Sequence, residues 1–297
     1  MELEAAFSLR TAPRFHPRTA WPDRLRLNSG VERVGARWHP RPDWRPLTPE
    51  ELGLLVGRAA RCAGSPGSAS PAAADGSSGR RPQGSEERIL GPSEAALLAI
   101  PARLRAAWWD QAERMTTAVS GDRDAFDRFA AALLEFLRFK RLPLPALCRV
   151  EVTVSKPGQP GTRIDPVTGG LAGLALPAAS SATPGGRTVA AINLGDEATH
   201  LVLLNLPHDT MRALRARHGQ PCAAALPPAE LAARFFDALP TYPLTRLRLE
   251  AGEGLWLPAA DVICDGWTNE KVDIDVVLTI RGEPSEALRE TARLTET

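Results

Sequence analysis

The stretch TVAAINLGDEATHLVLLNL, residues 188–206, decides the fold. Its two ends, 188–194 and 200–206, are dominated by valine, isoleucine and leucine, which favour β-strands. The five-residue connector GDEAT between them contains a glycine and is short enough for a hairpin. We therefore predict two paired antiparallel strands inside a β-rich domain.

Further strands are predicted on both sides of this stretch. The segments CRVEVTVS (148–155) and TRLRLE (245–250) alternate apolar and polar residues, which is typical of strands with one buried face. GLWL (254–257) and residues 272–280 complete the set. Clusters of Gly and Pro separate these segments, and several short strands divided by such turns indicate a sandwich or a barrel.

Helices are predicted around the strands. Thr48-Pro49-Glu50-Glu51 has the composition of a helix start, and this helix is expected to run to about Cys62. A second is expected to begin at Ser93 and to continue past Pro101, and others over 209–218 and 228–239. Residues 123–141 place apolar side chains at helical spacing, so that one broad face is expected to pack against a sheet.

The chain divides into five segments. Residues 1–62 are predicted to form an N-terminal arm with one helix, and 63–90, rich in Gly, Ser, Ala and Pro, a disordered linker or loop. Supporting helices follow over 91–145, the β-rich core over 146–283, and a C-terminal tail over 284–297.

The bulk composition excludes several classes of protein. With 36 Lys and Arg against 35 Asp and Glu, the net charge of +1 offers no electrostatic surface for nucleic acid or an anionic membrane. The four cysteines form no CxxC pair, which fits neither a zinc site nor a disulfide framework. There is no secretory apolar segment and no apolar run of about 18 residues. We expect a cytoplasmic protein, and the Arg, Ala, Pro and Gly bias is typical of high-GC bacterial coding.

Five sequence blocks together resemble a known family: Val189–Gly195, Leu201–Pro207, Gly252–Pro258, Val262–Thr268 and Lys271–Gly282. They are similar to bacterial Fe(II)/2-oxoglutarate-dependent oxygenases found near specialised-metabolite (natural-product) pathways. The resemblance covers about residues 145–283. It implies an α+β fold in which a double-stranded β-helix of the cupin type, a jelly roll, is backed by helices.

The resemblance also implies where iron would bind. In this family a His-x-Asp motif precedes the central hairpin and a second His follows the late Gly-Glu turn. Two imidazoles and one carboxylate leave three open iron positions, two for the keto acid and one for oxygen.

This chain departs from the family at each of those positions. The resemblance places Ala175 and Pro177 where the His-x-Asp motif belongs, and neither side chain can bind a metal. A second register uses Arg163-Ile-Asp165, which keeps a carboxylate but no His. The last His falls on Cys264, whose thiolate can bind iron, although a lone Cys in an apolar strand is also typical of a packed residue. We therefore expect no bound metal and no cofactor.

Other family positions carry candidate ligand contacts. Arg281 lies on the last strand, where such enzymes hold the far carboxylate of the keto acid, and Lys271 is the second candidate. Either residue is also compatible with an exposed charge at a strand end. Four further residues are candidates for substrate binding, with core packing or an internal hydrogen-bond network as the alternative: Asn193, Asn205, Trp256 and Trp267.

Three functions remain open from the sequence. The first is a pseudoenzyme that binds a free or carrier-bound small molecule, partners another pathway enzyme, or acts as a metal-free catalyst with acid–base candidates Asp165, Asp265, Asp273 and Asp275. The second is an active iron oxygenase, a hydroxylase using Fe(II) and 2-oxoglutarate, whose rebuilt ligands include His200, Cys264 and one carboxylate. The third is a non-catalytic interaction module whose Trp-rich arm docks on a partner.

Overall fold

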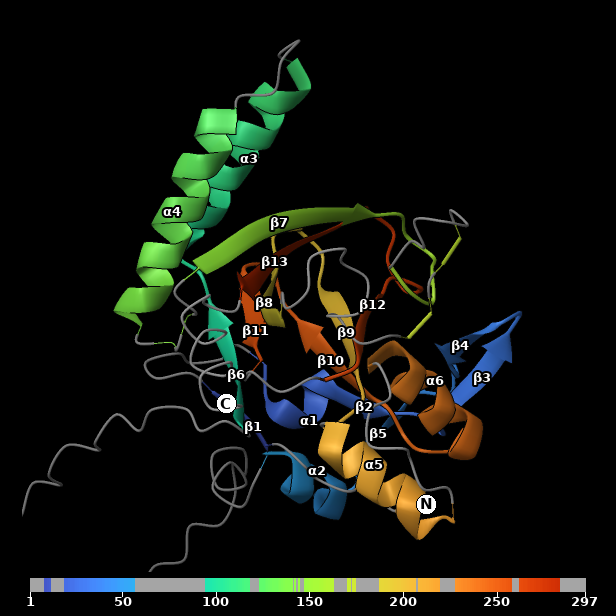
Figure 1. Ribbon diagram of the computed structural model, residues 1–297. Helices are drawn as coiled ribbons and strands as arrows, with labels where there is room; N and C mark the ends of the chain where they lie inside the picture. Colours follow the sequence, from blue (N-terminus) through green and yellow to red (C-terminus); the bar gives the residue numbers. More distant parts are fainter. Residues whose placement is uncertain are drawn as a thin grey trace, which may run out of the picture.

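The computed structural model describes residues 8–11, 19–56, 94–117, 123–140, 142, 144, 147–162, 170, 171, 173, 174, 187–206, 208–219, 228–257 and 262–283. The predicted linker, the C-terminal tail, Asp165, Ala175 and Pro177 lie outside these residues. Within them the protein is α+β, with mainly antiparallel sheets and six helices (Figure 1). None of the described helices combines the length and the hydropathy that crossing a membrane requires.

Sheet A contains six strands. Their order is β1 (Ser8–Thr11), β6 (Glu94–Ala99), β11 (Glu253–Trp256), β8 (Arg187–Asn193), β13 (Asp275–Glu283) and β7 (Leu147–Ser155). Only β1 and β6 are parallel, and the other neighbours are antiparallel. The predicted strand at 148–155 is therefore confirmed, and the one predicted at 272–280 is confirmed from Asp275 onward; the two pair with each other.

Sheet B contains five antiparallel strands. Their order is β12 (Cys264–Trp267), β9 (Thr199–Leu203), β10 (Thr245–Leu249), β2 (Leu25–Leu27) and β5 (Arg45–Pro46). A separate two-stranded sheet joins β3 (Val31–Val34) to β4 (Arg37–Pro40). The N-terminal arm thus supplies two strands of sheet B, in addition to packing on the body.

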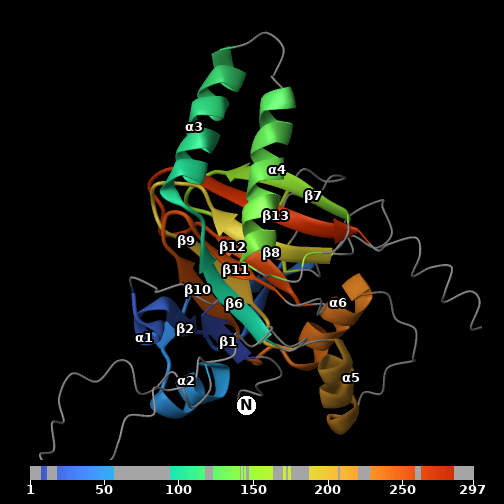
Figure 2. The same ribbon diagram turned by 90° about the vertical axis from the view of Figure 1, so that its left-hand side faces the viewer.

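Two pairs of helices cover the outer faces of the sheets. α3 (Ala102–Thr117) and α4 (Arg123–Phe139) bury Trp108, Phe129 and Leu133 against Ile192 and Leu278 of sheet A, and their far ends extend beyond the strands (Figure 1, Figure 2). α5 (His208–Arg217) and α6 (Pro228–Ala238) lie on the opposite side, packed on sheet B. The two phenylalanines of α6, Phe235 and Phe236, are fully buried.

A third core lies between the two sheets. Its side chains come from both of them and from α2 (Pro49–Val56): Leu25, Leu27, Leu55, Ala95, Leu97, Ala191, Leu201, Leu203, Leu247, Leu249 and Leu255. The start of α2 is confirmed, because the Thr48 hydroxyl accepts a bond from the Glu51 backbone N–H while the Glu51 carboxylate accepts one from the Thr48 N–H. The molecule therefore stacks helices, sheet A, sheet B and helices.

The predicted hairpin at 188–206 is wrong. β8 belongs to sheet A and β9 to sheet B, so the connector GDEAT crosses from one sheet to the other. Asn193 holds this crossing, since its amide donates to the carbonyls of Glu197 (2.8 Å) and Leu249 (3.0 Å) and its oxygen accepts from the Gly195 N–H (2.9 Å). A short connector fits both a hairpin within one sheet and a crossing between two sheets. Because each strand is apolar on both faces, its sequence does not show which strand it pairs with.

The predicted helix at Ser93 is also wrong over its first turns. Residues 94–99 form β6, between β1 and β11, and the helix begins only after Pro101. Ala95 and Leu97 face the core between the sheets, while Ala96 and Leu98 face α3 and α4. Burial on both faces of a sheet outweighs the helix propensity of alanine and leucine here.

Candidate functional site

Polar side chains occupy part of the face that sheet A turns towards sheet B. Along β13, Val276, Leu278 and Ile280 pack towards the helices, so the alternate residues Thr279 and Arg281 point to the other side. The register places Arg149 of β7 opposite Arg281, and Glu151 opposite Thr279. We call Arg149, Glu151, Thr279 and Arg281 the inter-sheet polar strip.

The strip carries a small excess of positive charge. The Glu151 carboxylate pairs with both arginines, with Oε1 3.1 Å from Arg149 Nε and Oε2 3.0 Å from Arg281 Nε. The side chain of Arg281 is only 23% exposed, against 66% for Arg149. Two guanidinium groups that share one carboxylate retain donors for an incoming carboxylate, which arginine binds with two parallel bonds.

Cys264 faces the same inter-sheet space. It lies opposite Leu203 on β9, and it packs, half-buried, against the core between the sheets together with Val277 of β13. Two positions singled out by the family resemblance, Cys264 and Arg281, are thus turned into the space between sheets A and B. The roles of Cys264 and Arg281 in binding a metal or a carboxylate stay predictions.

His200 lies on the opposite face of sheet B. It is paired in register with Trp267, which belongs to the core under α5 and α6, whereas Cys264 belongs to the inter-sheet core. His200 and Cys264 therefore cannot bind one metal ion together. In the described part of the chain, no three His, Cys, Asp or Glu side chains lie close enough to hold a metal. Among the described residues, the donors around Cys264 do not fit the iron triad of the family.

The environment of His200 disfavours its charged form. Burial lowers the pKa of this imidazole to about 4, and the positive charge of Arg246 adds to the effect. Both causes act on the imidazolium, which loses hydration and meets a like charge. His200 is therefore neutral in the folded protein near pH 7.

This shift predicts a pH-dependent loss of stability. The unfolded chain binds the proton near pH 6.5 and the folded chain near 4. The contribution of His200 to stability is therefore complete above about pH 6.5 and is lost as the pH falls towards 4, by about 3 kcal/mol at most. Urea unfolding at pH 7 and pH 4.5 measures this loss of stability. We expect the difference between the two pH values to be smaller in His200→Gln than in the unaltered protein, and to be unchanged in the exposed control His218→Gln. Equal losses in all three proteins would contradict the assignment.

Asp265 holds a loop in place. Its Oδ1 accepts hydrogen bonds from the Thr162 N–H (3.2 Å), the Thr162 hydroxyl (3.0 Å) and the Gly266 N–H (2.7 Å). It lies opposite Val202, on the face of β12 turned away from Cys264. These bonds tie Thr162 to β12, an arrangement that does not favour the predicted acid–base role of Asp265.

Lys271 is part of a buried ion pair. Its ammonium lies 2.9 Å from Asp275 Oδ1 and donates to the Ala198 carbonyl at 3.2 Å, and the two side chains are 2% and 1% exposed. The pair anchors the β12–β13 turn to the β8–β9 crossing. Its ammonium is therefore already engaged, and this placement does not favour a cofactor contact.

The four predicted substrate contacts are not brought together. Trp256 lies in the core under α3 and α4, and Trp267 in the core under α5 and α6, so they lie on opposite sides of the sandwich. Asn193 serves the β8–β9 crossing, and Asn205, 1% exposed, follows β9 in sheet B. The two tryptophans pack as core residues and Asn193 belongs to an internal hydrogen-bond network, while a role in substrate binding stays a prediction.

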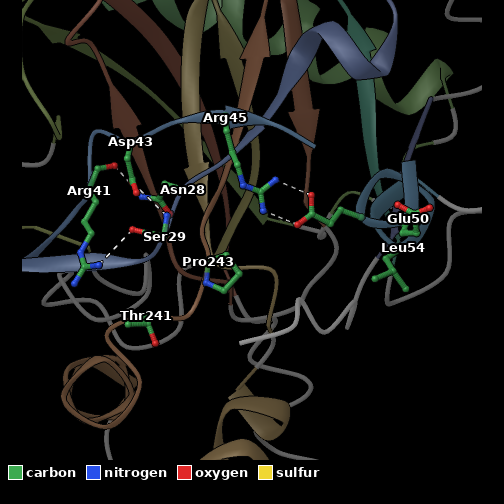
Figure 3. Close-up of a pocket in the computed structure, with 10 residues that line it drawn as sticks. Asn28, Ser29, Arg41, Asp43, Arg45, Glu50, Leu54, Thr241 and Pro243 are labelled. Carbon is green, nitrogen blue, oxygen red and sulfur yellow. Dashed lines mark hydrogen bonds and ion pairs between the residues drawn. The ribbon is translucent and has the colours of Figure 1, made fainter. Parts of the chain in front are cut away.

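A pocket of about 590 Å³ was missed by reasoning from the sequence (Figure 3). It lies at the far edge of sheet B and is lined by Asn28, Ser29, Arg41, Asp43, Arg45, Glu50, Glu51, Leu54, Thr241 and Pro243. The one sequence feature that pointed to this region is the alternation of arginine and acidic residues over 41–51. It could not reveal the pocket, because the last wall comes from residues 200 positions later in the chain.

Comparison of this chain with protein-family models, with curated proteins and with solved structures finds no match.

Proposed function

We propose that this protein is a small-molecule-binding relative of the Fe(II)/2-oxoglutarate oxygenases, built on a jelly roll whose iron triad is incomplete. Its ligand is a small organic anion with at least one carboxylate, held between the sheets by Arg281. In this proposal the protein is a pseudoenzyme of a bacterial specialised-metabolite pathway that binds a free or carrier-bound compound.

The nesting of strand pairs supports a jelly roll. In that fold one long antiparallel hairpin is rolled up, so that the first strand pairs with the last and the inner strands pair in turn. β7 pairs with β13, β8 with β11, and β9 with β10. After β7, Gly158 and Gln159 hydrogen-bond to Thr268 at the end of β12, where a jelly roll has its second strand.

The inter-sheet polar strip is the observation that carries the ligand class. The space between the sheets is filled by leucine at β6, β11 and β10, but its lining becomes polar at β13 and β7. Among the described residues Glu151 is the carboxylate paired with Arg149 and Arg281, which leaves one positive charge for an anion. A partly buried guanidinium favours a carboxylate over a neutral group, because the bonds are charge-assisted.

The donor set argues against iron. Cys264 stands where the family has its last His, and His200 lies on the other face of sheet B. By the resemblance, Ala175 and Pro177 supply no donor atoms. An active oxygenase with rebuilt ligands would need donors other than the His200 and Cys264 pair.

Calorimetric titration with 2-oxoglutarate tests the ligand class. We expect metal-free protein to bind it saturably and Arg281→Gln to bind it at least tenfold more weakly, because a charge-assisted hydrogen bond contributes roughly 1.5–3 kcal/mol. The matched control is Arg234→Gln, which removes an exposed arginine paired with Glu230 on α6. No binding by the unaltered protein, or equal affinities in all three proteins, would reject the proposal.

Anaerobic titration with Fe(II) and 2-oxoglutarate tests the metal. We expect no visible metal-to-ligand band and no stoichiometric iron after gel filtration. A band at one equivalent of iron would reject the pseudoenzyme in favour of the active oxygenase.

A further inference from the structure

The missed pocket shares no lining residue with the inter-sheet polar strip, and it lies at the opposite edge of sheet B from Cys264. A single row of paired residues crosses sheet B from Cys264 through Leu203, Thr245 and Leu27 to Arg45. Four strand spacings separate its ends, which is about 19 Å. The pocket lies at the Arg45 end, between the 41–45 segment, α2 and the loop before β10 (Figure 3).

One wall of the pocket is held by Asn28. This side chain is 3% exposed and makes four hydrogen bonds: its amide donates to the carbonyls of Gly30 (2.8 Å) and Arg41 (2.9 Å), and its oxygen accepts from the N–H groups of Gly30 and Leu244 (both 3.0 Å). Gly30 has φ +112°, and a Cβ there would lie 2.1 Å from the Pro240 carbonyl. This wall is therefore formed before any ligand arrives.

The second wall is joined to α2 by an ion pair. Arg45 binds the Glu51 carboxylate through two bonds of 2.9 and 2.7 Å, and Glu51 also accepts from the Thr48 N–H. This bidentate pair neutralises both of its members. Arg45 and Glu51 therefore shape the pocket and offer little net charge to a ligand.

Three other charged groups are available to a ligand. Arg41 donates to the Ser29 hydroxyl at 3.3 Å. Burial acts to raise the pKa of Asp43, but hydrogen bonds from Ser29 and the charge of Arg41 outweigh it and lower that pKa, so the carboxylate is ionised. On the α2 side, the Glu50 side chain makes no hydrogen bond or ion pair within the described part of the chain. The pocket thus presents one guanidinium and two carboxylates.

We infer that this pocket binds a small zwitterion carrying both an ammonium and a carboxylate, of the class of free basic amino acids. The ligand carboxylate meets Arg41 and the neighbouring α-ammonium meets Asp43, while the second ammonium extends past the Arg45–Glu51 pair towards Glu50 (Figure 3). Because these three side chains sum to one negative charge, a ligand with one net positive charge is the best match. The half-exposed Leu54 provides an apolar wall for a methylene chain, and the volume lies within the usual range for small-molecule pockets.

Calorimetric titration with L-lysine, L-leucine, butylamine and butyrate tests this inference. We expect L-lysine to bind most tightly and the two singly charged compounds at least tenfold more weakly than L-lysine. Arg41→Gln and Glu50→Gln should each weaken L-lysine binding at least fivefold, since each removes one charge-assisted contact. Arg234→Gln and Glu230→Gln, on the exposed face of α6, are the matched controls and should leave it unchanged.

The contrary outcomes are distinct. Absence of saturable L-lysine binding at concentrations on the order of millimolar, equal binding of butylamine and L-lysine, or equal effects of the pocket and control variants would overturn the inference. The result is separable from the inter-sheet ligand, because Arg41→Gln is expected to leave 2-oxoglutarate binding intact.

Discussion

Replacing Glu253 with alanine is expected to lower the free energy of unfolding by about 3–5 kcal/mol, because the buried Arg24 guanidinium is then left without its counter-charge. The two residues are 4% and 1% exposed. Arg24 Nη2 donates to Glu253 Oε1 at 2.9 Å, and Nη1 donates to Oε2. Arg24 also donates to the Thr19 carbonyl at 2.7 Å, so the pair links α1 (Trp21–Arg24) to the start of β11.

Urea unfolding at pH 7 measures this loss, and Glu250→Ala is the matched control. Glu250 lies three residues away and pairs with Arg248 at the surface, where the side chains are 26% and 47% exposed. An exposed pair of this kind contributes about 0–1 kcal/mol. Replacing both Arg24 and Glu253 with methionine should recover part of the loss, because no buried charge then remains. Similar effects of Glu253→Ala and Glu250→Ala would contradict the buried-pair account.

Replacing Lys271 with methionine is expected to cost a similar amount, about 3–5 kcal/mol, because the Asp275 carboxylate then stays buried without its cation. The Lys271 side chain is 2% exposed and also donates to Ala198, so its loss loosens the β8–β9 crossing as well. The control is Lys156→Met, an exposed lysine just beyond β7. Thermal and urea unfolding measure both variants.

This second variant also separates a structural role from a ligand role. If Lys271 serves the fold, stability falls and the 2-oxoglutarate affinity of the remaining folded protein is unchanged. If affinity falls while the urea midpoint stays at that of the unaltered protein, Lys271 binds the cofactor carboxylate, and the structural assignment is wrong.

The elements that follow from the sequence are those with one dominant period. α4 is predicted because Phe129, Leu133 and Leu137 recur at helical spacing, and all three are buried. β7 is predicted because Val150 and Val152 alternate with charged residues, and both pack under the helices. In each case one side of the element packs in a core and the other side carries mostly polar residues, so the pattern in the sequence is clear.

The elements that do not follow are those covered on both sides. In a four-layer molecule a central strand is apolar on both faces, so alternation no longer tells which face points where. The sequence therefore could not show that Trp256 points to α3 and Trp267 to α5 and α6, or that His200 and Cys264 face opposite ways. β6 was missed for the same reason.

The charged contacts that matter for stability were also hidden from the sequence. Arg24 and Glu253 stand 229 positions apart, and neither has a neighbour in the sequence that marks it as buried. Lys271 and Asp275, four positions apart, were noticed as separate candidates for ligand chemistry. Only the fold shows that they neutralise each other.

Sheet B is built from strands that lie far apart in the sequence, and this limits the order in which the molecule can fold. β2 pairs with β5 along one edge and with β10 along the other, and the hydrogen bond between Leu244 and Asn28 spans 216 positions. During synthesis β2 and β5 therefore leave the ribosome long before β10 exists, and the edge of β2 that β10 later covers stays open to other chains. Closing such distant pairs also carries a large loop entropy, so folding is expected on the slow side, from milliseconds to seconds.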